Sequence, residues 1–388
     1  MKELIQAFEE RFQTSVEGAR FFYSGGRVNL IGEHTDYNYG HVFPAALSLG
    51  SYVCIKNRND SVIRLAATDL DGVVEADLNR LEQYKSLPWG KYQLGIINEF
   101  LKRGDQVSGA DILYYDTIPH SGGLSSSAAI QLSTARAIAD MNGIVINNID
   151  LAQLARSSEH DYIGVQCGVM DQFASAMGKE GHAILLNCKD LSYEYIPLDL
   201  KDCCLVITNT NKKRQLADSK YNERFAECQK ALAILQQYRT DLTALCDLTP
   251  EEFLDLSSKL DDPILRKRAQ HVVFENDRVL KSAEVLKKGD LEKFGRYLNE
   301  SHASLKELYE VTGIELDTLA ENAQKMDGVV GSRMTGAGFG GCTVSLVKTE
   351  FADEFCRRLG ELYTDKIGYA PSFYRPAISD GSREVTEI

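Results

Sequence analysis

The hydrophobic and polar positions along the first third of the chain follow the short period that is typical of β-strands. Apolar, β-branched and aromatic residues gather in brief runs between polar turns. Strands are therefore expected at residues 27–32, 41–47, 51–57, 62–67 and 110–116. Further strand-like runs follow at residues 182–188, 203–210 and 342–347.

Apolar residues spaced three or four apart predict helices elsewhere. The first twelve residues read as an amphipathic helix, and longer helices are expected at residues 126–143, 149–164, 219–239, 262–289 and 315–328. Residues 165–172, which follow the helix expected at 149–164, are expected to form a loop. Strands followed by helices, twice along the chain, predict an α+β protein in two lobes.

The length of 388 residues favours more than one domain. We expect an N-terminal lobe at residues 1–190 and a C-terminal lobe at residues 191–388. The last ~20 residues are expected to pack back on the N-terminal lobe.

Charge and cysteine content narrow the class of protein. The formal net charge of −13 argues against broad contact with nucleic acid or with an anionic membrane. No run approaches the ~20 apolar residues of a membrane span, and the start does not resemble a signal peptide. The nine cysteines are odd in number and lack CxxC spacing, which favours reduced thiols. We expect a cytoplasmic monomer.

Residues 117–132 are rich in glycine and serine and run directly into a predicted helix. Glycines let a backbone approach a ligand, and the free N–H groups at a helix N-terminus favour an anion. Serine hydroxyls can donate to phosphate oxygens or coordinate Mg²⁺. A glycine turn with a serine N-cap explains the same residues equally well. The P-loop pattern GxxxxGK[ST] is absent from the chain.

A second glycine-rich segment holds five glycines between residues 331 and 341. A loop of this kind can lie on a ligand phosphate, although a tight connection from a helix to a strand explains it more simply. Two such loops, far apart in the sequence, would suit one nucleotide held between two lobes.

Polar residues are dense in segment 25–47, where Arg27, Glu33, His34, Asp36 and Asn38 lie close together. Groups that donate and groups that accept hydrogen bonds, placed side by side, suit a polyhydroxylated ligand. A solvated loop is the alternative.

Carboxylates that could carry chemistry follow in segment 157–175, where Glu159 falls on a predicted helix and Asp171 in the expected loop. Phosphoryl transfer needs positioning, Mg²⁺ and a group near the attacking hydroxyl. The residues by themselves indicate a nucleotide-dependent enzyme acting on a polar small molecule, and they do not single out Asp171 among the 56 acidic residues.

Together these segments resemble the three motifs of the GHMP kinases, a family that includes galactokinase, homoserine kinase, mevalonate kinase and phosphomevalonate kinase. The segment GRVNLIGEHTDYN resembles the galactokinase signature in particular. CGVMDQFAS, NTNKKRQLADSKYNERFAEC, ENDRVL and RMTGAGFGGC follow in the order of that family, so the resemblance covers roughly residues 5 to 385.

The resemblance implies a fold and an activity. An N-terminal lobe similar to domain 2 of ribosomal protein S5 and a ferredoxin-like C-terminal lobe would hold ATP and a sugar between them. The reaction would be ATP-dependent phosphorylation of galactose at the anomeric hydroxyl. It would give α-galactose 1-phosphate and ADP, the first committed step of galactose catabolism in the Leloir pathway.

The resemblance also implies roles for individual residues. Asp171 and Arg27 match the catalytic pair, and Ser127 and Glu159 match the residues associated with Mg²⁺. The sugar is expected at Arg27, Glu33, His34, Asp36, Gly168, Asp171 and Tyr221. ATP is expected at Gly122, Gly123, Leu124, Ser125, Ser126, Ser127, Ala128, Gly336 and Gly338. Whether the aspartate is a general base or an electrostatic anchor stays open.

Two other functions remain to be separated from this one. A kinase for N-acetylgalactosamine or another galactose-like sugar would share most of these motifs, and Tyr39 departs from the glycine that often follows the sugar motif. A non-catalytic sugar sensor is disfavoured because the run from Gly123 to Ala129 is uninterrupted and Asp171 is present.

Overall fold

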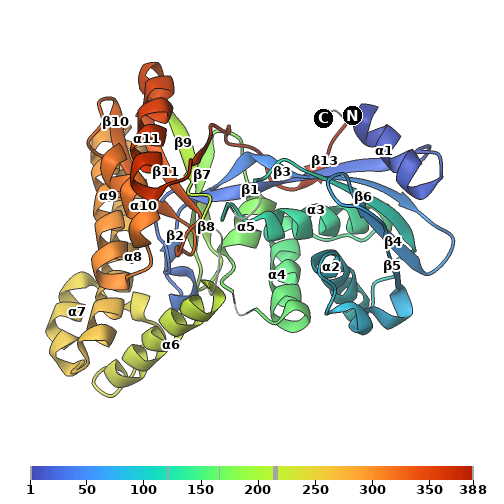
Figure 1. Cartoon of the computed structure of the whole chain (residues 1–388). Coiled ribbons are helices and arrows are strands. Elements are labelled where there is room, and N and C mark those ends of the chain that lie inside the picture. The colour runs from blue at the N-terminus through green and yellow to red at the C-terminus, as the bar shows by residue number, and fades with distance from the viewer. Residues whose placement is uncertain (1, 120–121, 166, 213–216, 387–388) are drawn as a thin grey trace.

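The computed structural model describes residues 2–119, 122–165, 167–212 and 217–386, which form two lobes joined along a broad junction. In Figure 1 the N-terminal lobe, blue to green, lies on the right, and the helices of the C-terminal lobe, yellow to red, stand on the left. Both chain ends lie at the outer side of the N-terminal lobe. The predicted α+β architecture in two lobes is confirmed.

A six-stranded sheet organises the N-terminal lobe in the order β13-β1-β3-β6-β4-β5. Neighbouring strands are antiparallel except β4 and β6, which run parallel. Its strands are β1 (Arg20–Asn29), β3 (Pro44–Asn57), β4 (Val62–Ala67), β5 (Val74–Asp77), β6 (Ala110–Asp116) and β13 (Arg383–Glu384). The runs expected as two strands at 41–47 and 51–57 form mainly one long strand, β3, with a two-residue strand β2 (His41–Val42) before it.

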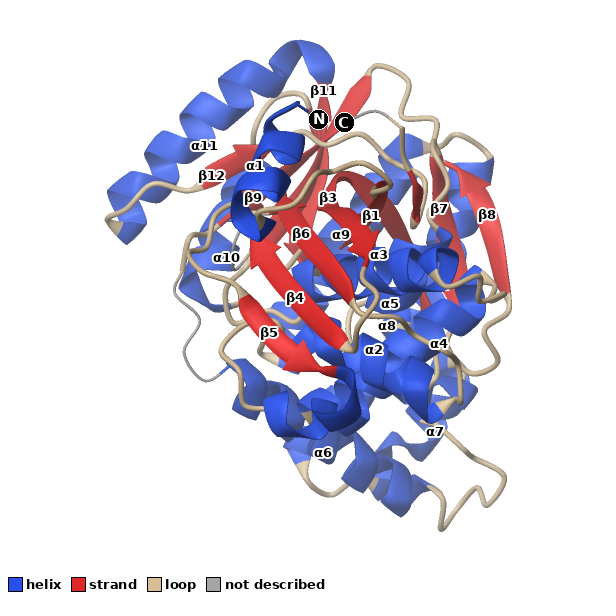
Figure 2. Ribbon diagram, turned by 90° about the vertical axis from the view of Figure 1, so that its right-hand side faces the viewer, coloured by secondary structure: helices blue, strands red, loops and turns tan. Residues whose placement is uncertain are grey.

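Helices cover both faces of this sheet (Figures 1 and 2). Successive residues of a strand point to opposite faces, so Cys54 of β3 packs under α1 while Val53 and Ile55 face the other helices. The helix on the first face is α1 (Lys2–Phe12). Those on the second are α2 (Lys91–Lys102), α3 (Ser126–Met141), α4 (Asn148–Ser158) and α5 (Met170–Met177).

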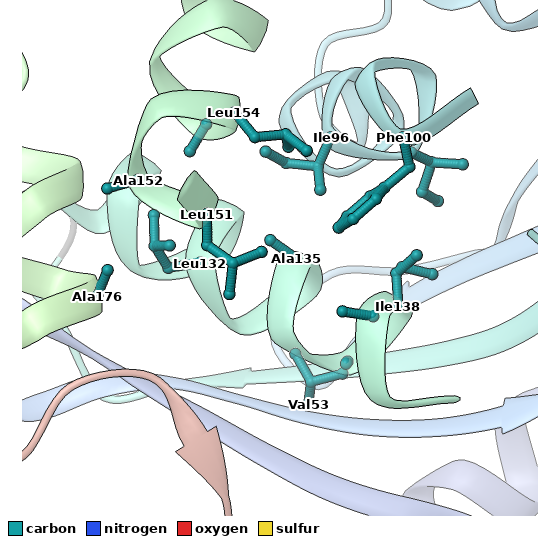
Figure 3. Close-up of a cluster of buried hydrophobic side chains, with 14 of the residues drawn as sticks. Val53, Ile96, Phe100, Leu132, Ala135, Ile138, Leu151, Ala152, Leu154 and Ala176 are labelled. Carbon is teal, nitrogen blue, oxygen red and sulfur yellow. The ribbon is translucent and has the colours of Figure 1, made fainter. Parts of the chain in front are cut away.

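The largest hydrophobic core fills the space between the sheet and this second helical layer. Figure 3 shows side chains of α2, α3 and α4 converging above Val53, with Phe100 and Leu132 among them. Phe100, Leu132 and Ile138 are completely buried. This packing fixes α3, and with it the loop that precedes α3.

The C-terminal lobe contains a four-stranded antiparallel sheet in the order β10-β11-β9-β12. The strands are β9 (Cys203–Asn209), β10 (Val329–Thr335), β11 (Cys342–Lys348) and β12 (Ser372–Tyr374). Helices α8 and α9 pack on one face, and α10 and α11 pack on the other. The helices of this lobe are α6 (Ala217–Leu235), α7 (Pro250–Leu256), α8 (Pro263–Lys287), α9 (Leu291–Ser304), α10 (Gly313–Ala323) and α11 (Ala352–Ile367).

Helix α8 illustrates how well local signals set a boundary. The side chain of Asp262 accepts a hydrogen bond from Ile264 N at 2.8 Å, and Pro263 occupies the first helical position. The helix ends at Lys287, close to Gly289, which has a positive φ.

The two lobes share structure at their junction. A three-stranded sheet of β2, β7 (His182–Asn187) and β8 (Tyr193–Pro197) lies there, and the expected boundary at 190/191 falls in the turn between β7 and β8. The chain end returns to the first lobe, where β13 pairs with β1 and Ser379 N donates to Ala46 O. The division into lobes at 190/191 stays a prediction.

Two smaller observations complete the description. Across the described part of the chain, no helix combines the length and the apolar character that crossing a membrane requires. All nine cysteines are free thiols.

Candidate active site

The loop after β1 forms one wall of the site. Gly32 turns the chain with a φ of +104°, and a Cβ there would lie 2.7 Å from Val279 and 3.0 Å from His41 O, so only glycine fits. A short 3₁₀-helix at Asp36–Asn38 follows, anchored by Thr35 Oγ1, which donates to Gly32 O at 2.8 Å. This tight path turns Glu33, His34 and Asp36 toward the junction of the lobes.

The loop before α3 lies directly against β1. Arg27 N donates to Leu124 O at 3.1 Å, and Arg27 Nη1 donates to Gly123 O at 2.8 Å. A Cβ on Gly26 would lie 2.4 Å from Leu124 O, so glycine permits this approach. Ser125 has a φ of +57°, and the 16-residue helix α3 begins at the next residue. Backbone N–H groups at that helix start are suited to an anion.

Asp171 lies in the first turn of α5, not in a loop as the sequence suggested. The polar and glycine-containing stretch before it concealed the helix start, and packing of Phe173 and Ala176 in the core stabilises this short helix. Arg27 pairs with Asp171 bidentately, with Nε to Oδ1 at 2.8 Å and Nη2 to Oδ2 at 2.9 Å. Ser125 Oγ also donates to Asp171 Oδ2. The carboxylate is therefore held in one orientation.

These elements enclose a cavity of about 310 Å³, a volume within the range of roughly 300–1,000 Å³ that is usual for small-molecule sites. Residues from both lobes line it. Those that the sequence had singled out are Arg27, Glu33, His34, Asp36, Ser127, Glu159, Gly168, Asp171, Tyr221 and Gly336.

The remaining candidates lie beside the cavity. Arg27 and Cys342 hold the loop before α3 in place. Arg27 donates to Gly123 O and Leu124 O, and Cys342 Sγ donates to Gly122 O at 2.7 Å. Gly338 packs against Val311, where a Cβ would lie 2.4 Å from the Val311 carbonyl oxygen. The candidates outside the lining are Gly122, Gly123, Leu124, Ser125, Ser126, Ala128 and Gly338.

Other residues of the lining were not foreseen. Tyr92, at the start of α2, comes from a segment without a polar motif, so nothing in its sequence surroundings pointed to it. Cys167 and Met170 lie on either side of Gly168, in a segment where only Glu159, Gly168 and Asp171 had been singled out. Val165 and Ala337 complete the lining.

Burial and crowding of negative charge shape the electrostatics of the cavity. Burial, followed by the charge of Asp171, raises the pKa of Asp36 to about 7. The same two causes raise the pKa of Glu159 to about 7. Burial, with the neighbouring His271, lowers the pKa of His34 to about 3, so this imidazole is neutral near pH 7.

Gly168 shows how closely the cavity wall is packed. A Cβ at this position would lie 1.9 Å from Asp36 Oδ2, so glycine is required for the two segments to meet. A second, smaller cavity of about 180 Å³ lies behind that contact and is lined by Tyr39, Arg156 and His160 among others. Tyr39 itself is 49% exposed and does not line the larger cavity.

The donor set suits a hard cation better than a soft one. Among the described residues, no group of three or more histidine, cysteine, aspartate or glutamate side chains is placed to hold a metal ion. Ser127 and Glu159 nevertheless bring a hydroxyl and a carboxylate together at the cavity. Oxygen ligands of this kind suit Mg²⁺ that is also bound by phosphate oxygens and water.

Three sequence families match the chain. The galactokinase galactose-binding signature matches residues 6–57, the GHMP kinase N-terminal domain matches residues 91–179 and the GHMP kinase C-terminal domain matches residues 282–365. A crystal structure of Lactococcus lactis galactokinase complexed with galactose superimposes with a TM-score of 0.96, at 43% identity over 99% of both chains. The Methanococcus jannaschii mevalonate kinase shares the fold, with a TM-score of 0.65 at 20% identity.

The fold, the polar cavity between the lobes and these matches thus define a GHMP kinase. Within that class, the galactokinase of Clostridium acetobutylicum is 47% identical, over 99% of this chain and 100% of that protein. The galactokinase of Bacillus subtilis is 46% identical over 95% of both. The chain belongs to the galactokinase family.

Proposed function

We propose that this protein transfers the γ-phosphoryl group of ATP to the anomeric hydroxyl of galactose, giving α-galactose 1-phosphate and ADP. This is the first committed step of galactose catabolism. The observation that carries the proposal is the bidentate Arg27–Asp171 pair at the cavity, within a chain of the galactokinase family.

Asp171 is proposed to accept a hydrogen bond from the attacking sugar hydroxyl. Three donors, two from Arg27 and one from Ser125, already orient the carboxylate, and a carboxylate has about four acceptor positions. The remaining position is suited to the sugar hydroxyl, whose oxygen would then point at the phosphorus. Positioning of this kind is the main protein contribution to phosphoryl transfer.

The rest of the sugar is proposed to contact Glu33, His34, Asp36, Gly168 and Tyr221. Groups that accept and groups that donate hydrogen bonds both line this half of the cavity, as a ring of hydroxyl groups requires. His34 supports the role because its imidazole is neutral and its Nδ1 is held by Tyr37 Oη at 2.9 Å, which leaves Nε2 for a sugar hydroxyl.

The nucleotide phosphates are proposed to bind the loop from Gly122 to Ala128 and the glycines at 336 and 338. The start of α3 supports this, because N–H groups there can hold phosphate oxygens without any lysine. Gly123 O lies 3.2 Å from where a Gly336 Cβ would be, so the two loops meet at the cavity.

Mg²⁺ is the proposed metal, held by Ser127 and Glu159. The raised pKa of Glu159 supports the fit, because its burial beside Asp171 is unfavourable until a cation offsets the charge. When bound, Mg²⁺ would neutralise charge on the phosphates.

A coupled ADP-release assay tests the proposal. ATP and Mg²⁺ are supplied with galactose, glucose, N-acetylgalactosamine, talose, homoserine or mevalonate. Of these substrates, galactose is the one expected to give ADP release well above background. Preference for another sugar would assign a different substrate to the same mechanism, and silence on every substrate, with ATP and galactose still binding, would favour a sugar sensor.

A further inference from the structure

Glu33 makes contacts with the second lobe that the binding of a sugar alone would not require. Its side chain lines the cavity, yet it is only 1% exposed. Oε1 accepts a hydrogen bond from Gly336 N at 2.6 Å, and Oε2 accepts one from Asn29 Nδ2. The carboxylate therefore joins the sugar-side loop of the first lobe to the glycine-rich loop of the second.

Two further side chains of β10 reinforce this connection. Arg333, completely buried, donates through Nη1 to Glu33 Oε1 at 3.3 Å and to the carbonyl oxygens of Asn29 and Leu30 at 3.1 Å each. Thr335 Oγ1 donates to Asn29 O at 3.0 Å and accepts from Asn29 N at 3.2 Å. We call Asn29, Glu33, Arg333, Thr335 and Gly336 the lobe clamp.

The lobe clamp ends at both predicted ligand sites. Glu33 and Gly336 line the same cavity, and Gly336 is in turn adjacent to Gly123 of the loop before α3. Three donors, from Gly336, Arg333 and Asn29, use three of the about four acceptor positions of the Glu33 carboxylate. One position is left for a sugar hydroxyl, so a bound sugar would fix the same carboxylate that fixes Gly336 N.

We infer that Glu33 is a positioning residue that couples the two substrate sites, so that a bound sugar orders the Gly336 loop for the nucleotide and a bound nucleotide does the same for the sugar. The inference rests on the proposed function, since it takes galactose and ATP as the two ligands. Such coupling is reciprocal, so each ligand must raise the affinity of the protein for the other by the same factor.

Calorimetric titration measures this factor. The dissociation constant of galactose is determined with and without a saturating complex of Mg²⁺ and a non-hydrolysable ATP analogue. In the wild type, galactose is expected to bind about fivefold tighter or more when the nucleotide is present, the lower end of usual coupling. Glu33→Gln, which removes the charge at Arg333, is expected to bring the ratio close to one, whatever it does to galactose affinity itself.

Thr335→Val separates coupling from direct sugar contact. Thr335 lies outside the cavity lining, and this substitution removes both of its hydrogen bonds to Asn29. Galactose alone should therefore bind as in the wild type, while the ratio of galactose affinities with and without nucleotide falls by half or more. Ser332→Ala is the matched control on the same strand. Among the described residues its hydroxyl bonds to Ser345 Oγ within the second lobe, and the affinity ratio of this variant should equal that of the wild type.

The outcomes separate the inference from the proposed function. No binding of galactose to the wild type would overturn both. Binding of galactose with a ratio of one in the wild type, or with an unchanged ratio in Thr335→Val and Glu33→Gln, would overturn the coupling alone. If Glu33→Gln does not fold, Thr335→Val carries the test.

Discussion

The core beneath the N-terminal sheet and the cavity between the lobes differ in material and in origin. The core in Figure 3 is apolar, and its side chains come mostly from three helices with regular spacing. The cavity is polar, and it draws one residue each from β1, α2, α3 and α6 and a few more from α5 and from the loops after β1 and β10. Changes in the core should therefore act on stability, whereas changes in the cavity should act on turnover.

The largest effect is expected from Asp171→Asn. Loss of the charge at the proposed position of the attacking hydroxyl should lower kcat by about 10²- to 10⁴-fold. The free energy of unfolding should change by less than about 2 kcal/mol. Loss of the ion pair with Arg27 is offset because the charge of Asp171 no longer repels the carboxylates of Asp36 and Glu159. Steady-state kinetics and urea unfolding measure the two quantities.

The control for this variant is Asp161→Asn, which removes the same charge from an exposed side chain. It should leave kcat unchanged. Turnover near the wild-type value in Asp171→Asn would remove this aspartate from the mechanism.

Phe100→Ala should lower stability and leave turnover nearly unchanged, the opposite of the result expected for Asp171→Asn. Truncation of a completely buried aromatic side chain should lower the free energy of unfolding by about 3–5 kcal/mol. In the folded fraction, kcat should stay within about twofold of the wild type, because α2 supplies only Tyr92 to the cavity. Leu254→Ala, at a side chain that is 59% exposed, is the control and should barely alter stability. A large loss of kcat without a loss of stability would contradict the comparison.

A pH-dependent effect distinguishes the cavity from the core more finely. Burial raises the pKa of Asp36 from 3.8 to about 7. Between these values the folded state keeps a proton that the unfolded state releases, so stability is lost as the pH rises through the folded pKa. Asp36→Asn does not titrate. Its stability relative to the wild type should increase by about 2 kcal/mol from pH 5 to pH 8, after allowance for the partial exposure of Asp36.

Urea unfolding at both pH values measures this difference. Asp161→Asn again serves as the control and should show no comparable change. A difference that is equal at pH 5 and pH 8 would show that burial of the Asp36 charge does not weaken the fold.

The smallest effect is expected from Tyr39→Gly. Tyr39 lines the smaller cavity behind Asp36 and is half exposed, so the KM for galactose should shift by about twofold and the KM for ATP should not change. The φ of +55° at this position favours glycine, so a slight gain in stability is also expected. A change of tenfold or more in sugar preference would place Tyr39 at the sugar itself.

The sequence was sufficient for much of the local structure. The start of α8 followed from Asp262 and Pro263, and the helices around Leu132 and Leu151 followed from their apolar spacing, because capping and periodicity are local properties. It was insufficient at Asp171, where a short helix depends on its packing in the core, and at residues 41–57, where pairing with β1 and β6 merges two runs into one strand.

By itself, then, the sequence determined the α+β class, most helices, the family and a set of candidate residues. Only the tertiary structure decided how these residues meet. It paired Arg27 with Asp171, joined Glu33 to Arg333 and Gly336, added Tyr92 to the cavity and placed Tyr39 outside it. The reason is physical. Periodicity and capping act within a few residues of the chain, whereas a cavity is formed by contacts between segments that only the packing of two lobes brings together.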